Sequence, residues 1–86
     1  MTYISHAVRS IRNDPIEGEP VRLVLTVADD ADPSAVAASV ESLGGEVVRD
    51  LPFDRVLVAV DQTDVDAVCS LAEVESVETD AVLHQT

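Results

Sequence analysis

The chain has 86 residues, 47% of them apolar, which is enough for one domain with a modest core and excludes an extended disordered chain. Its formal net charge is −12 and all five basic residues are arginines, so we expect no binding to nucleic acid and none to an anionic membrane surface. Aromatic residues are only 2% of the chain, so the core is expected to consist of small aliphatic side chains.

The sequence also carries expectations about the cellular environment. The N-terminus lacks the basic and apolar regions of a signal peptide, and no apolar run reaches the length of a membrane span, so we expect a cytoplasmic protein. The seventeen acids are dispersed along the chain rather than grouped in one block, which favours a protein adapted to a cell with high internal salt.

The first twenty residues differ in pattern from the rest. Ile4, Val8 and Ile11 have the spacing of a short helix, and the stretch NDPIEGEP that follows contains two prolines and a glycine, which interrupt regular structure. We therefore interpret residues 1–20 as a partly ordered N-terminal appendage and residues 21–86 as the domain proper.

The next segments predict a strand followed by a helix. Residues 21–28, VRLVLTVA, have the β-branched and alternating character of a buried strand. Asp32 is placed to cap a helix whose first residue is Pro33, and Gly44 or Gly45 is placed to end it. The apolar residues at helical spacing within this segment are Val36, Val40 and Leu43.

The second half of the chain repeats this order with an additional strand. Residues 46–53 predict a strand that Pro52 would place at a sheet edge, and residues 55–60 predict a central strand. Thr63, with an acid three residues later, indicates the start of a second short helix. Residues 74–84 predict a fourth strand.

The predicted order β-α-β-β-α-β is that of an α+β, ferredoxin-like fold. In that fold two helices cover one face of a four-stranded antiparallel sheet, the first and third strands are central, and the opposite face stays open. Strand alternation then predicts a small apolar patch on the open face, bordered by two carboxylates, and such patches mark binding surfaces. The patch residues are Val24, Thr26, Leu57 and Ala59, and the bordering acids are Glu78 and Asp80.

We find no pattern typical of catalysis or of metal binding. Cys69 is the only cysteine and is expected to be a small core residue, and His6 and His84 are near opposite ends of the chain. No glycine-rich phosphate loop or nucleophile motif is present, and an acylphosphatase-type enzyme would need an arginine where ADDADP supplies acids. We therefore expect a protein that is not an enzyme and that needs neither a metal nor a cofactor.

Two stretches carry a resemblance to a known family. GGEVVRDLPFDRVLVAV, and LAEVESVETDAVLHQT at the end of the chain, resemble the propeptide domain of subtilisin-type serine proteases and its free-standing relatives, the subtilisin propeptide-like peptidase inhibitors. The resemblance covers residues 21–86. It implies that the open sheet face packs on two parallel surface helices of a subtilisin-type serine protease, and that Glu78 and Asp80 cap the N-termini of those helices.

The resemblance also implies a role for the C-terminal tail. The tail would lie in the substrate cleft as an added strand, with Leu83 in an apolar pocket and Thr86 nearest the catalytic serine. Thr86 differs from the large residue that many subtilisins prefer at this position. The tail residues concerned are Val82, Leu83, His84, Gln85 and Thr86.

Two functions remain open from the sequence. Because the chain ends where the protease of a propeptide would begin, we expect a free-standing inhibitor, which could also assist folding of the protease. The alternative is a non-catalytic regulatory or scaffold module that forms a homodimer through the open sheet face.

Overall fold

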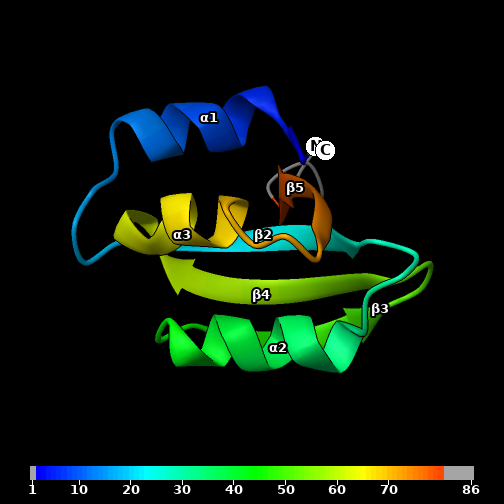
Figure 1. The fold of residues 1–86 in the computed structure, drawn as a ribbon. Coiled ribbons are helices and arrows are strands. Elements are labelled where there is room, and N and C mark those ends of the chain that lie inside the picture. The colour runs from blue at the N-terminus through cyan, green and yellow to red at the C-terminus, as the bar shows by residue number, and fades with distance from the viewer. Residues whose placement is uncertain (1, 81–86) are drawn as a thin grey trace, which may run out of the picture.

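The computed structural model describes residues 2–80, which form a five-stranded sheet and three helices (Figure 1). The strands are ordered β1-β5-β2-β4-β3 across the sheet. In chain order the elements are β1 (Tyr3–Ile4), α1 (His6–Asn13), β2 (Pro20–Val27), α2 (Pro33–Ser42), β3 (Glu46–Leu51), β4 (Arg55–Asp61), the 3₁₀ turn η1 (Gln62–Asp64), α3 (Val65–Cys69) and β5 (Val74–Thr79).

The predicted fold class is wrong. The sheet is mixed and has five strands, with β1 parallel to β5 and the other neighbours antiparallel, and the helices number three rather than two. The difference arises from the N-terminal segment, which supplies both the additional strand and the additional helix. A strand of two residues gives no alternation for a sequence pattern to reveal.

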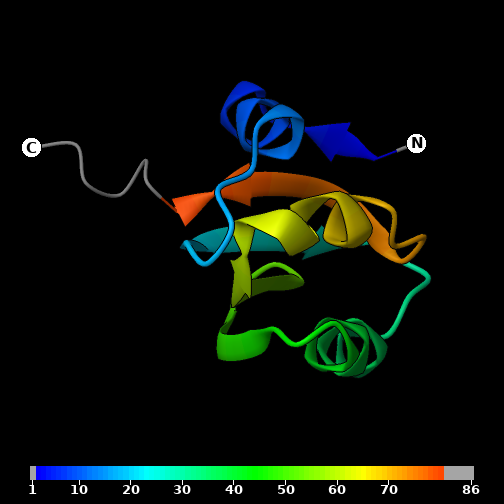
Figure 2. The same cartoon turned by 90° about the vertical axis from the view of Figure 1, so that its left-hand side faces the viewer.

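Residues 2–5 of the N-terminal segment are attached to β5 (Figure 2). The Thr2 hydroxyl donates to the Val74 carbonyl at 3.0 Å, and the Ser5 N–H donates to the Val77 carbonyl at 3.0 Å. The Ser5 hydroxyl also accepts the N–H of Val8, which caps α1. Because the Val8 side chain is fully buried in the common core, this segment belongs to the same hydrophobic cluster as the rest of the sheet.

The core lies between the sheet and the layer of helices. Alternate residues of β2, such as Leu23 and Leu25, point to the helices, and so do alternate residues of β4, such as Val56 and Val58. All three helices contribute buried residues to this one cluster, so they lie on the same side of the sheet (Figure 1). No aromatic side chain is among the cluster residues of the described chain, and most of them are valines.

The first predicted helix has the expected ends. The Asp32 carboxylate accepts the N–H of Ser34 at 3.0 Å, Pro33 is the first helical residue, and Gly44 ends the helix region with a φ of +90°. The second predicted helix, which is η1 followed by α3, begins differently from the prediction. Asp61, rather than Thr63, supplies the cap, and its carboxylate accepts the Thr63 N–H at 3.3 Å before the 3₁₀ turn.

Gly45 allows α2 to approach β4 closely. A Cβ atom at this position would lie 2.6 Å from Val60 Cγ1 and 2.8 Å from Val40 Cγ1, and 3.1 Å from the carbonyl oxygen of Ala59. We therefore expect Gly45→Ala to lower the free energy of unfolding by about 1–3 kcal/mol through overpacking, measured by urea denaturation. Gly18→Ala is the control. An alanine there would strain the backbone, whose φ is +83°, but no atom lies within 4 Å of its Cβ position, so it would cause no overpacking. Equal losses in the two variants would contradict the overpacking account.

Candidate functional site: the open sheet face

The side of the sheet that the helices leave uncovered, which we call the open face, carries the four predicted patch residues. Register places Val24 opposite Leu57, with Thr26 and Ala59 two residues away on their strands and on the same side. Val24, Thr26 and Ala59 are half-buried. Leu57 is only 7% exposed although it lies outside the core cluster, so its neighbours on the open face cover most of it.

The two predicted acids lie at the β5 end of this patch and have different surroundings. Glu78 is paired with Val24 and is exposed. Asp80, directly after β5, is 7% exposed, and its Oδ2 lies 3.9 Å from Nη1 of Arg22. Among the described residues its Oδ1 is buried without a hydrogen-bond partner. A buried carboxylate oxygen of this kind is destabilising until a donor reaches it.

Formal charge is nearly balanced on the open face. Register places three arginines there, opposite Ala59, Leu57 and Thr26, together with four acids. The chain as a whole carries a charge of −12, so the helix side and the loops hold most of the excess of acids. The open face is therefore the part of the surface that an acidic protein can bring against another protein with least repulsion. The charged residues of the open face are Arg22, Arg49 and Arg55, with Glu46, Asp61, Glu78 and Asp80.

The predicted tail, Val82 to Thr86, lies outside the described residues. The open face, with which the tail is predicted to act in binding, is described up to Asp80. The structure therefore places the four patch residues and the two acids together, and the function of the tail stays a prediction.

Side chains with catalytic potential do not gather elsewhere in the described chain. Cys69 is buried, and burial raises the pKa of its thiol, an effect that Asp66 reinforces and Arg12 opposes. Within residues 2–80 no group of three or more metal-ligating side chains comes together. The helices of that same range are all too short or too polar to cross a bilayer.

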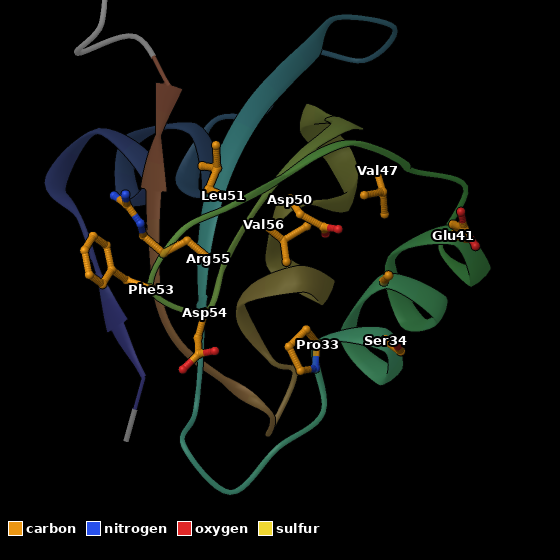
Figure 3. Close-up of a pocket in the computed structure, with 11 residues that line it drawn as sticks. Pro33, Ser34, Glu41, Val47, Asp50, Leu51, Phe53, Asp54, Arg55 and Val56 are labelled. Carbon is orange, nitrogen blue, oxygen red and sulfur yellow. The ribbon is translucent and has the colours of Figure 1, made fainter.

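A groove of about 630 Å³ lies between α2 and the β3–β4 hairpin (Figure 3). Pro33, Ser34 and Glu41 line its helix side, and none of the predicted site residues contributes to it. Phe53 and Arg55 lie at the hairpin end, away from those helix residues (Figure 3). The groove thus lies outside the predicted patch, but it shares Arg55 with the open face at the tip of the hairpin.

Sequence reasoning missed Phe53. Its side chain is 84% exposed, and the Arg55 guanidinium lies 5.9 Å from the centre of its ring. The strand predicted over residues 46–53 includes Phe53, whereas β3 ends at Leu51 and Phe53 lies in the turn. The signal available in the sequence was a lone phenylalanine next to Pro52 in a chain with almost no aromatic residues.

Comparison with known proteins gives one match. Residues 3–80 match the family model described as "Putative peptidase inhibitor domain". No curated protein and no solved structure matches the chain significantly. The matched range includes β1 and α1 as well as the whole open face, so it covers every described element of the fold. The chain therefore belongs to this family of peptidase inhibitor domains, whose partners are proteases.

Proposed function

We propose that this chain inhibits a subtilisin-type serine protease through its open face and its C-terminal tail. The family supports protease inhibition, and the resemblance of residues 21–86 to subtilisin propeptides supports the class of protease. The observation that carries the proposal is the pair of acids at the end of β5, on a face that no helix covers: Glu78 is exposed, and the Asp80 Oδ1 lacks a donor among the described residues, so a rotation of its side chain toward an incoming N–H would satisfy it.

The chemistry that satisfies Asp80 is that of a helix N-terminus. The first four N–H groups of a helix have no partner within the helix, and the helix dipole favours a negative charge near them. The exposed Glu78 lies in β5 and Asp80 follows directly after the strand, so the Cα atoms of the two acids are at most about 7 Å apart. Two adjacent surface helices of a protease would meet both acids on one flat face.

The proposed role of the tail follows from this arrangement of the acids. If β5 is held against the protease by its acids, the next residues leave the sheet beside the contact and can enter a neighbouring cleft. Leu83 to Thr86 would then pair with the cleft as a product-like strand, with main-chain hydrogen bonds supplying affinity and Leu83 supplying an apolar contact. Resistance to cleavage would come from the folded domain, which keeps the tail in place.

The proposal is tested with one protease from each mechanistic class: a subtilisin-type serine protease and representative cysteine, aspartic and metallo-proteases. Assays are run in molar potassium chloride, because the charge of −12 is then screened. We expect competitive inhibition of the subtilisin-type enzyme alone. Inhibition of a different class would contradict the assignment to subtilisins, and inhibition of none would contradict the proposed function.

A further inference from the structure

The only two aromatic side chains of the chain are both strongly exposed and lie at the two ends of one row across the open face. Tyr3 is 59% exposed and Phe53 is 84% exposed, whereas the core contains neither. Register connects them strand by strand. The row runs from Tyr3 on β1 through Ser76 on β5, Thr26 on β2 and Arg55 on β4 to Leu51 on β3, beside the turn that holds Phe53.

Phe53 is held in a backbone conformation that is unfavourable for its side chain. Phe53 has a φ of +66° and Asp54 a φ of +58°, so two consecutive residues with side chains are left-handed. The connection between β3 and β4 has three residues, Pro52 to Asp54, and positive φ angles within it favour Gly or Asn, because a bulky residue with positive φ is uncommon. Folding therefore gains little from a phenylalanine here, since its ring is not buried, its backbone conformation is unfavourable, and an exposed contact with the Arg55 guanidinium stabilises only weakly.

The turn is nevertheless fixed by its neighbours. The Val27 N–H donates to the Asp54 carbonyl at 2.8 Å, which attaches the turn to β2. The Arg55 Nε–H donates to the Pro52 carbonyl at 3.0 Å while its guanidinium faces the Phe53 ring. An exposed ring on a turn whose backbone is hydrogen-bonded in place has the properties of a binding anchor: a large apolar area on a backbone with little freedom left to lose.

We propose that Phe53 and Tyr3 are the two aromatic anchors of the protease interface and determine which protease is bound. This inference rests on the proposed function. The row spans four strand spacings, about 19 Å at about 4.8 Å each, so the anchors bracket the patch instead of lying within it. The protease surface would present an apolar depression to each ring, at the edges of the contact made by the acids and the central patch. Aromatic residues are enriched in protein interfaces, and the low net charge of the open face around the row favours such a contact.

The test separates binding from stability with variants of opposite expected effect. Phe53→Asn should raise the melting temperature by about 4–8 °C, because asparagine tolerates the left-handed backbone, and should weaken inhibition of a subtilisin-type protease about 30-fold. Tyr3→Ala should leave the melting temperature nearly unchanged and weaken inhibition about tenfold. Phe53→Tyr keeps the ring and should inhibit as the natural chain does.

Two controls complete the design. Asp54→Gly relieves strain in the same turn but keeps the ring, so the melting temperature should rise while inhibition is unchanged. Ile16→Ala removes a side chain that is 57% exposed, in the loop before β2. That loop joins β2 at Pro20, at the end of the strand opposite to the Phe53 turn, so this variant should leave inhibition unchanged.

The outcomes are distinct. Undiminished inhibition by both Phe53→Asn and Tyr3→Ala, or a lower melting temperature for Phe53→Asn, would overturn the inference while the proposed function stands. Loss of a homodimer in the two variants, seen by sedimentation with inhibition intact, would overturn it by assigning the row to self-association. If the natural chain inhibits no protease, the proposed function fails and the inference fails with it.

Discussion

Removal of residues 2–13 is expected to abolish cooperative folding of the remaining chain. The deletion exposes the outer edge of β5, removes the fully buried Val8, and leaves the core residues that face α1 in contact with water. One buried side chain of this size contributes about 1.5–3 kcal/mol, and the partly buried Ile4 and Ile11 and the hydrogen bonds from Thr2 and Ser5 add to it. The sum approaches the 5–15 kcal/mol that holds a typical domain together.

Urea denaturation followed by circular dichroism in molar potassium chloride measures this effect. Val8→Ala should lower the free energy of unfolding by about 1.5–3 kcal/mol, whereas Arg9→Ala, at the next and exposed position of α1, should change it little. A truncated chain that unfolds at the same midpoint as the full chain would show that residues 1–20 are a separable appendage, as the sequence predicts. Until then that division stays a prediction.

Replacement of Glu78 and Asp80 by alanine is expected to weaken protease binding and to leave the free domain as stable as before, or slightly more stable. Asp80 is a buried charge whose one ionic contact, to Arg22, is 3.9 Å long, so its loss removes an unfavourable group. If each acid caps a helix of the protease, each contributes about 0.5–2 kcal/mol to binding. The double variant should therefore bind from about fivefold to nearly a thousandfold more weakly.

The matched control is the double replacement of Glu41 and Asp66 by alanine. It changes the net charge by the same amount, but both residues are exposed on helices of the other side of the sheet. Inhibition constants of the two double variants are compared at the same salt concentration. A similar change in both would mean that only the overall charge matters, and no change in either would reject the capping role.

Much of the arrangement from β2 to β5 follows from patterns that the sequence displays. Strands β2 and β4 are visible because their valines and leucines are nearly continuous, and α2 is visible because Asp32 and Pro33 begin it and Gly44 follows its end. The additional strand β1 and the packing of α1 were not predicted, for a physical reason. Ile4, Val8 and Ile11 indicated a helix, but whether a short amphipathic helix packs on the domain depends on tertiary contacts that local pattern does not contain.

The residues of the open face could be predicted in part from the sequence, as the strands could. Alternation along the strands is a local property, so it assigned Val24 and Leu57 to the same face, and the register between strands then placed Glu78 beside them. The burial of Asp80 could not be predicted, since it depends on how closely the neighbouring strand and Arg22 approach. The exposure of Phe53 was not predicted either, since an aromatic residue is more often part of a core, although its place between Pro52 and Asp54 indicates a turn.

The most direct test of the central claim is to measure inhibition of a subtilisin-type serine protease by the full chain and by a chain that lacks Leu83 to Thr86. Both are titrated in molar potassium chloride against a range of substrate concentrations. The account predicts that the full chain competes with substrate, and that the shortened chain stays folded and binds weakly through the open face while competition is largely lost. Equal competitive inhibition by the two chains, or none by the full chain, would contradict it.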